Sequence, residues 1–175
     1  MADWTIFTVL SWTESYFKTH FIDSPRLTAE ILLGFSLGIK RLDLYLQYDR
    51  PLQENELTDY KKLIKRRIQR EPVAYITGEK GFWESDFLVR NGVLIPRPDT
   101  ETLVEEVIKA LSAGTSEKKP KKILELGTGS GAIIISVAKA FKEHGYYAND
   151  ISSKALDSAT RNAKKLVHDK IRFFS

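Results

Sequence analysis

The chain has 175 residues, of which 42% are hydrophobic, enough for one ordinary domain or two small ones with a packed core. It has no cysteine and its three histidines, His20, His144 and His168, are scattered, so we expect no disulfide, no thiolate nucleophile and no metal site. No apolar run reaches the roughly 20 residues that span a bilayer, and no signal peptide is evident, so we expect a cytoplasmic protein without membrane contacts. A net charge of +4 is small for a nucleic-acid binder, so we expect no direct nucleic-acid binding.

The first seventy residues have apolar side chains at three- and four-residue intervals, which is typical of helices. Short polar breaks divide this region into segments. The pattern predicts helices within residues 4–17, 23–38, 40–49 and 54–70. We expect residues 1–75 to form a small helical bundle.

The sequence KKLIKRRIQR, residues 61–70, concentrates positive charge on the last of these helices. Its basic residues lie on or near the face opposite an apolar stripe, which consists of Leu57, Tyr60, Ile64 and Ile68. This face is either simply solvated or a patch that meets an acidic partner or RNA, and the sequence leaves both interpretations open.

After Gly78 the pattern changes to aromatic and branched residues, in GFWESDFLVRNGVLI at 81–95. This composition, with a turn signal at Asn91-Gly92, predicts a β-hairpin or paired short strands. We expect residues 76–97 to form a β-hairpin linker.

A further helix is predicted to begin at Pro98, because proline suits a first helical turn. The acidic Asp99 and Glu101 suit the positive end of its dipole. Its buried stripe is expected to consist of Leu103, Val104, Val107, Ile108 and Leu111.

From Ile123 onward, strand and helix patterns alternate along the chain. Strand patterns occupy residues 122–127, 146–150 and 170–175, and helix patterns occupy 131–144 and 153–167. This alternation is typical of a parallel sheet with crossover helices, so residues 98–175 are predicted to form part of an α/β, Rossmann-like domain.

The sequence KKILELGTGSGAIIISVA places three alternate glycines, Gly127, Gly129 and Gly131, where a strand gives way to a helix. Glycine lets the backbone turn tightly and approach a ligand, so we expect this loop, with Thr128 and Ser130, to bind a cofactor. The third glycine comes one position too early for a dinucleotide fingerprint, which weakens a nicotinamide dehydrogenase interpretation. No Gly-Lys-Ser/Thr follows, which excludes the phosphate loop of nucleotide hydrolases.

Two carboxylates narrow the choice of ligand. Glu125, two residues before the first glycine, would repel a pyrophosphate and attract an ammonium group. Asp150 ends the next predicted strand, about twenty residues after the loop, a spacing at which an acidic residue reaches ribose hydroxyls. Together these features indicate S-adenosylmethionine, although each alone has a simpler explanation: a tight turn, a solvated strand end, and the cap of the next helix.

These residues resemble the HemK-type release-factor glutamine methyltransferases, also called the PrmC family. The resemblance extends over essentially the whole chain. It rests on SPRLTAEILL at 24–33, REPVAYITGEKGFWESDFLV at 70–89, VLIPRPDTETLVE at 93–105, ILELGTGSGAI at 123–133 and NDIS at 149–152. The glycine loop is common to many methyltransferases, whereas IPRPDTETLVE followed by that loop is far more selective.

The resemblance implies S-adenosylmethionine-dependent N5-methylation of the glutamine in the Gly-Gly-Gln motif of peptide chain release factors. It also implies that the helical module docks the release factor. Residues of the Pro-Arg-Pro-Asp-Thr-Glu block are expected to shape the cofactor pocket: Pro96, Arg97, Asp99, Thr100 and Glu101. Their simpler role would be a helix start that braces the sheet.

The family orients the substrate amide with an Asn-Pro-Pro-Tyr segment, which does not occur in these 175 residues. We therefore expect no catalytic residue in this chain, and expect the chain to be a catalytically inactive fragment in which the glycine-loop strand lies at a sheet edge. The alternatives are an adenine-N6 methyltransferase of nucleic acid and a non-catalytic module that binds a release factor or the cofactor.

Overall fold

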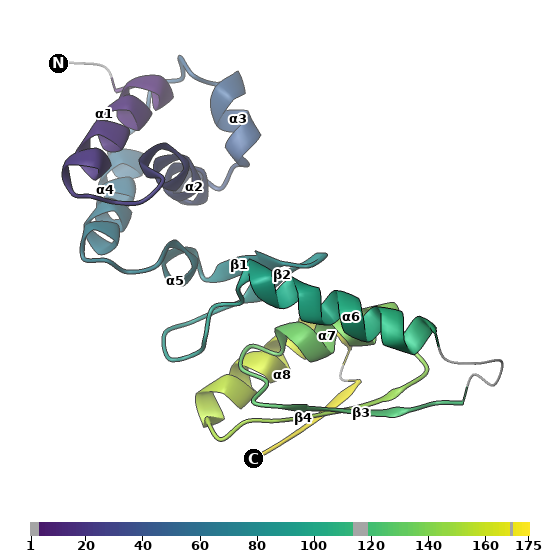
Figure 1. Cartoon of the computed structure of the whole chain (residues 1–175). Helices are drawn as coiled ribbons and strands as arrows, with labels where there is room; N and C mark the ends of the chain where they lie inside the picture. The colour runs from purple at the N-terminus through teal and green to yellow at the C-terminus, as the bar shows by residue number, and fades with distance from the viewer. Residues whose placement is uncertain (1–3, 114–118, 169) are drawn as a thin grey trace. The chain divides into compact units, whose positions relative to one another are not determined.

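The computed structural model describes residues 4–113, 119–168 and 170–175, and the chain divides into two compact units, Met1–Thr77 and Gly78–Ser175 (Figure 1). The first unit is helical and the second contains strands and helices, which confirms the predicted fold class. The structure groups the hairpin with the α/β unit. Within the described residues, no helix has both the length and the apolar character needed to cross a membrane.

The helical unit contains five helices in its described part. These are α1 (Ile6–Thr19), α2 (Pro25–Leu37), α3 (Arg41–Leu46), α4 (Glu54–Ile68) and α5 (Val73–Thr77). The first four lie where the apolar spacing predicts them. The single turn of α5 was not predicted: the backbone N–H groups of Tyr75 and Ile76 donate to the carbonyl of Pro72, so the proline that ends α4 also starts a new turn.

Local signals set the helix ends in this unit. Thr5 caps α1, because its hydroxyl accepts a hydrogen bond from the backbone N–H of Thr8 at 3.3 Å. Gly38 ends α2 in a left-handed conformation with a φ of +66°. The helices enclose fully buried side chains, including Leu10, Phe17 and Leu33.

One charged residue lies inside this bundle. The side chain of Glu30 is 3% exposed; it accepts hydrogen bonds from Arg26 Nε at 2.7 Å and from the hydroxyl of Tyr45, and it forms an ion pair with Arg41, whose Nε lies 3.1 Å from Oε2. A buried carboxylate is tolerated when it is paired in this way. Glu30 thus ties α2 to α3.

The α/β unit begins with an antiparallel hairpin of β1 (Glu79–Phe82) and β2 (Ser85–Leu88). The hairpin was predicted correctly, but its predicted turn was wrong: the strands turn at Trp83-Glu84, where Trp83 has a φ of +51°. Asn91-Gly92 does lie in a turn, which is closed by a hydrogen bond from Val93 N to Arg90 O, but no described strands pair across it. Asn91-Gly92 therefore forms a turn, as its sequence predicts, but this turn does not connect two paired strands.

The rest of the unit alternates strands and helices. It contains a 3₁₀ turn, η1 (Pro98–Thr100), followed by α6 (Glu101–Ser112), β3 (Lys122–Leu126), α7 (Ala132–Ala140), β4 (Gly145–Asn149), α8 (Ser153–Val167) and β5 (Ile171–Phe174). The strands form a parallel sheet in the order β3-β4-β5, so the predicted edge position of β3 is confirmed for the described residues.

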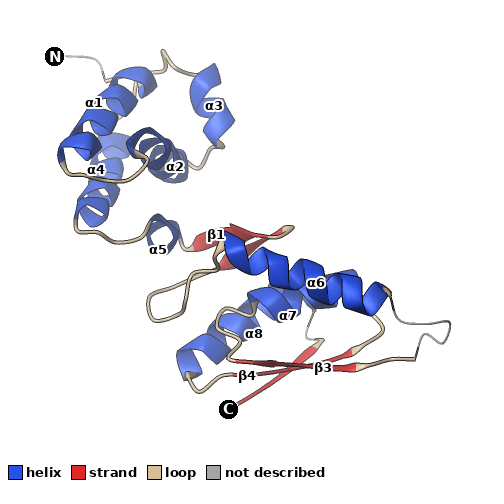
Figure 2. Cartoon of the chain, in the orientation of Figure 1, coloured by secondary structure: helices blue, strands red, loops and turns tan. Residues whose placement is uncertain are grey.

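Helices α6, α7 and α8 lie on one side of this sheet (Figure 2). The strand residues that face them, such as Tyr146, Ala148 and Ile171, are buried. The opposite face exposes Leu124 and Leu126, which are 56% and 72% exposed. In α6, Val104 is fully buried as predicted, whereas Leu103 is 51% exposed, because α6 packs on α7 through a narrower stripe than the sequence indicates.

Candidate cofactor site

The glycine loop joins β3 to α7 at the carboxyl end of the sheet, as predicted. Gly127, Gly129 and Gly131 have φ angles of +73°, +58° and +80°. A Cβ atom on Gly131 would lie 2.8 Å from Ile135 Cδ1 and 3.2 Å from Ala159 Cβ, so this glycine lets α7 and α8 pack closely. A Cβ atom on either of the other two would meet nothing within 4 Å, so their backbone borders open space.

Residues at the end of β4 and directly after it hold the loop in place. Asp150 Oδ2 accepts a hydrogen bond from the N–H of Gly129 at 2.8 Å. The backbone carbonyl of Asn149 accepts hydrogen bonds from the N–H groups of Gly127 and Thr128 at 3.0 and 2.9 Å. Asp150 does not cap α8, because Ser152 does. Asp150, which the sequence predicts to reach ribose hydroxyls, therefore contacts the glycine loop directly.

Glu125 lies inside the unit rather than at a solvated strand end. Its Oε2 accepts hydrogen bonds from the hydroxyl of Thr128 at 2.7 Å and from the N–H of Ile134 at 3.2 Å. Burial, which is only partly offset by these two bonds, raises the pKa of Glu125 to about 7. The carboxylate thus stabilises the first turn of α7 and has no cation as a partner among the described residues.

A cavity of about 140 Å³ opens beside the loop. Three segments line it: the hairpin, the residues before α6, and the loop with the start of α7. The predicted site residues that line it are Pro96, Arg97, Thr100, Glu125, Gly127, Thr128, Gly129 and Ser130. The structure thus brings the Pro-Arg-Pro-Asp-Thr-Glu block and the glycine loop together, although they are separated by a helix and a strand in the sequence.

The other predicted site residues do not line the cavity. Gly131 lies between α7 and α8, and Asp150 holds the loop through its hydrogen bond from the N–H of Gly129. Glu101 Oε1 accepts a hydrogen bond from the backbone N–H of Trp83 at 2.9 Å, so it joins α6 to the hairpin turn. The side chain of Asp99 is exposed at the start of α6.

Some residues of the site were not predicted. Phe82, Leu94, Ala132 and Ile133 also line the cavity. Ala132 and Ile133 directly follow the loop, which could have suggested them. Nothing in the local sequence pattern shows that Phe82 comes from the hairpin to the same place.

Asn162 is the most important residue that the sequence interpretation missed. It is fully buried in α8. Its Oδ1 accepts a hydrogen bond from Leu88 N at 2.8 Å, and its Nδ2 donates to Leu88 O at 3.0 Å and to Ser130 O at 2.9 Å. Asn162 therefore fixes the hairpin and the glycine loop relative to each other. Its spacing from Ala155 and Ala159, on the buried face of α8, was the available signal.

The lining suits a ligand that carries no phosphate. It contains no lysine, Arg97 is its one cation among the described lining residues, and Glu125 supplies a carboxylate. The open space beside Gly127 and Gly129 admits a ligand close to the backbone. Among the ranges that the structure describes, no cluster of His, Cys, Asp and Glu could hold a metal ion.

Comparison with known proteins finds two domain families along the chain. The PrmC N-terminal domain matches residues 8–78, and the methyltransferase small domain matches residues 100–175. These two matches correspond to the helical region and to the sheet with its glycine loop.

Curated relatives match nearly the whole chain. It is 42% identical over 172 residues to the release factor glutamine methyltransferase of Chlorobaculum tepidum, which covers 97% of this chain and 58% of that protein. The corresponding enzymes of Leptospira interrogans and Bacillus subtilis are 42% and 35% identical, over 93% and 97% of this chain and 56% and 58% of their own lengths. The chain therefore spans somewhat more than half the length of these relatives. With both domain matches in this order, the chain belongs to the release factor glutamine methyltransferase family.

Proposed function

We propose that the protein to which these residues belong transfers a methyl group from S-adenosylmethionine to the side-chain nitrogen of the glutamine in the Gly-Gly-Gln motif of a peptide chain release factor. One observation carries this proposal. The glycine loop, braced by Asp150, shares a single cavity with Pro96, Arg97 and Thr100. The names of the curated relatives support the choice of substrate. Such an enzyme would act in the cytoplasm, where translation ends.

The residues around the cavity would hold the cofactor. S-adenosylmethionine supplies an activated methyl group on a sulfonium and carries an ammonium group and no phosphate. The carboxylate of Glu125 would attract the positive end of the ligand, and its raised pKa of about 7 means that it is largely ionised only above neutrality. The backbone of Gly127 and Gly129 would lie against the ligand, because no side chain fills the space beside them. The carboxylate of Asp150 retains lone pairs that could accept hydrogen bonds from ribose hydroxyls.

Substrate orientation needs residues beyond those described above. An amide nitrogen is a poor nucleophile, so positioning must supply much of the catalysis. In the family, the Asn-Pro-Pro-Tyr segment would do this, and it does not occur in these 175 residues. We therefore expect the 175-residue chain to bind the cofactor and a release factor without turnover.

The experiment is a methyl-transfer assay with labelled S-adenosylmethionine and a purified, unmethylated release factor. A longer protein that contains these residues together with an Asn-Pro-Pro-Tyr segment should label the release factor at its Gly-Gly-Gln glutamine, and the 175-residue chain should not. A Gly-Gly-Ala release factor is the matched control and should remain unlabelled. Labelling of DNA adenine in place of the release factor would contradict the proposal and favour a nucleic-acid methyltransferase.

A further inference from the structure

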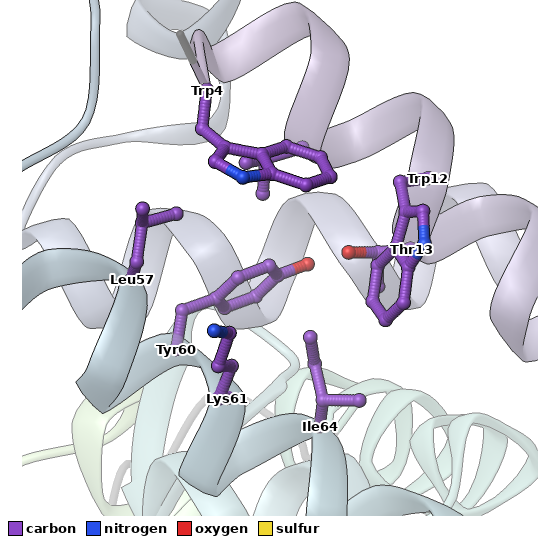
Figure 3. A pocket seen from close by; sticks show the side chains of 8 residues that line it. Trp4, Trp12, Thr13, Leu57, Tyr60, Lys61 and Ile64 are labelled. Atoms are coloured by element: carbon purple, nitrogen blue, oxygen red, sulfur yellow. The ribbon is translucent and has the colours of Figure 1, made fainter. Parts of the chain in front are cut away.

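Cavities outside the cofactor site differ in the charge of their lining. The helical unit has a cavity of about 230 Å³ between α1 and α4. Figure 3 shows its aromatic walls, formed by Trp4, Trp12 and Tyr60, and Lys61, the one charged residue among its described lining. The α/β unit has a cavity of about 190 Å³ that is lined by two arginines. The second of these cavities is therefore the stronger candidate for an anion site.

This arginine cavity lies where the base of the hairpin meets α8. Its lining consists of Gly78, Leu88, Val89, Arg90, Ser158 and Arg161. None of these residues lines the cofactor cavity. A Cβ atom on Gly78, which has a φ of +78°, would meet nothing within 4 Å, so the backbone there borders open space. The arginine cavity is thus a separate site within the α/β unit.

The two arginines share a single carboxylate. Arg90 Nη2 donates to the backbone carbonyl of Lys154 at 3.0 Å and pairs with Asp157 Oδ2. Arg161 Nε lies 3.1 Å from the same oxygen of Asp157. Within the described ranges, no other carboxylate pairs with either guanidinium. Two positive charges therefore face one negative charge, and an excess of positive charge remains at the cavity.

Several hydrogen-bonding groups at the cavity are not fully used. A guanidinium has five N–H donors, and Arg90 Nε is buried without a hydrogen-bond partner among the described residues. Ser158 is 3% exposed, and its hydroxyl contacts the carbonyl of Leu88 only at 3.4 Å, which is long for a hydrogen bond. Buried polar groups are normally well paired, so both residues have capacity for a further acceptor.

The charge and the donors select one class of ligand. The excess positive charge disfavours a cation, and guanidinium groups suit carboxylate and phosphate oxygens. Donors on two segments, two guanidiniums and one hydroxyl, match the three terminal oxygens of a phosphate better than the two of a carboxylate. Two arginines that share Asp157 are too few for the repeated phosphate contacts of a nucleic acid. We infer that the arginine cavity binds a single phosphate group through Arg90, Arg161 and Ser158.

This inference goes beyond the proposed function and does not depend on it. The probe is inorganic phosphate, titrated into the full 175-residue chain at constant ionic strength and followed by the width of its ³¹P resonance. Binding should broaden the resonance in a saturable way. Acetate added at the same ionic strength should reverse the broadening at least about fivefold less effectively than unlabelled competition by further phosphate predicts. No broadening, or acetate that competes as well as phosphate, would overturn the inference.

Two arginine substitutions provide a matched pair. Arg161→Gln should weaken phosphate binding at least about tenfold, because it removes a charged donor group from the cavity. Arg172→Gln makes the same change at an exposed position of β5 that does not line the cavity, and it should leave phosphate binding unchanged. Equal effects of the two substitutions would show that phosphate responds only to net charge and would overturn the inference. Circular dichroism of each variant checks that it folds.

Two further variants separate geometry from charge. Arg161→Lys keeps the charge and loses the planar fork, so it should bind phosphate more weakly than the wild-type chain and more tightly than Arg161→Gln. Ser158→Ala should weaken binding about fivefold without a change in net charge. Wild-type affinity in Ser158→Ala and in Arg161→Lys would contradict a built phosphate site.

The glycine loop is another place where an anion could bind, since it leads into the first turn of α7. Phosphate that S-adenosylmethionine displaces, and that binds wild-type and Arg161→Gln chains equally, would lie at the loop and would overturn the inference. Displacement by a short single-stranded RNA at far lower concentration than by phosphate would also overturn it and indicate a nucleic-acid surface.

The source of the phosphate group is distinguished by a last comparison. Phenyl phosphate carries the same group on an apolar body, which Leu88 and Val89 could contact. If it binds more tightly than inorganic phosphate and Arg161→Gln weakens both, the site holds a phosphomonoester. If the two bind equally and Arg161→Gln weakens both, the ligand is free phosphate. Both results support the site, whereas binding of phenyl phosphate that Arg161→Gln leaves unchanged contradicts it.

Discussion

The two units differ in the partners that they give to a carboxylate, which is buried for Glu30 and partly buried for Glu125. In the helical unit, Glu30 is paired with Arg26, Arg41 and Tyr45, so its charge is used entirely to hold helices together. In the α/β unit, Glu125 has a hydroxyl and one backbone N–H as partners and lies against a cavity. A carboxylate that is partly buried without a cation is costly, and such residues are typical of ligand sites.

The units also differ in how completely they bury apolar surface. Helices surround the core of the first unit, where Leu33 is fully buried. The sheet of the second unit has helices on one face, and its other face exposes Leu124 and Leu126. The first unit therefore has the character of a closed scaffold, whereas the second presents an open sheet face beside its cofactor loop.

The largest expected effect comes from the closed core. Leu33→Ala should destabilise the helical unit by about 2–5 kcal/mol, because it leaves a cavity in a packed interior. Leu124→Ala, the same change on the open sheet face, should cost less than about 0.5 kcal/mol. Urea unfolding monitored by circular dichroism compares the two. Similar losses from both substitutions would contradict the distinction between the units.

The second effect depends on pH and on Glu125. Its folded-state pKa of about 7 lies above the ordinary value of 4.5, so the folded chain holds a proton that the unfolded chain has released between these values. Its contribution to stability is therefore fully present below about pH 4.5 and lost as the pH rises through about 7, by about 3 kcal/mol in all. Glu125→Gln should remove this loss, so the variant should be the more stable one at pH 8. If the stability of the wild-type chain and of Glu125→Gln depends on pH in the same way, the carboxylate of Glu125 does not have the raised pKa.

The third effect concerns the hydrogen bonds of Asn162. Asn162→Ala leaves the backbone groups of Leu88 and the carbonyl of Ser130 without these partners, so it should cost about 2 kcal/mol. It should also weaken cofactor binding, because Ser130 belongs to the loop. Lys164→Ala, on the exposed face of the same helix, is the control and should change neither quantity. A thermal melt measures the stability, and a titration measures the cofactor affinity. An unchanged cofactor affinity would show that Asn162 supports only the hairpin.

The smallest effect on stability is expected on the open sheet face. Replacing Leu124 and Leu126 together by serine should change the free energy of unfolding by less than about 0.5 kcal/mol and should reduce self-association, because exposed apolar surface next to an unpaired strand edge promotes association. Analytical ultracentrifugation of the chain and the double variant measures this. If the wild-type chain is as monomeric as the double variant, the exposed sheet face does not promote self-association.

Periodicity and glycine spacing predicted most of the fold. The range 153–167 predicted for the last helix coincides with α8, and the edge position of β3 is confirmed. These features are local, or follow from one handedness rule for parallel strands. Long-range packing decided the rest: Leu103 is exposed because of where α6 packs, and Trp83-Glu84 forms the hairpin turn through strand register.

In the candidate site, too, the local features were predicted and the long-range contacts were not. The sequence predicted the glycine loop and Asp150, and the structure adds the hydrogen bond between them. It did not predict Asn162, because an isolated asparagine on a helix usually faces solvent, and only the fold brings Leu88 and Ser130 to it.

Binding of S-adenosylmethionine to the 175-residue chain tests the central claim most directly. Gly129 and Gly38 have similar φ angles of +58° and +66°, and a Cβ atom on either would meet nothing within 4 Å, but only Gly129 lines the cavity. Asparagine tolerates this conformation, so Gly129→Asn and Gly38→Asn are matched in strain. Isothermal titration should show binding to the wild-type chain and to Gly38→Asn, and affinity at least about tenfold weaker for Gly129→Asn. No binding to the wild-type chain, or equal binding to both variants, would contradict the claim that this loop holds the cofactor.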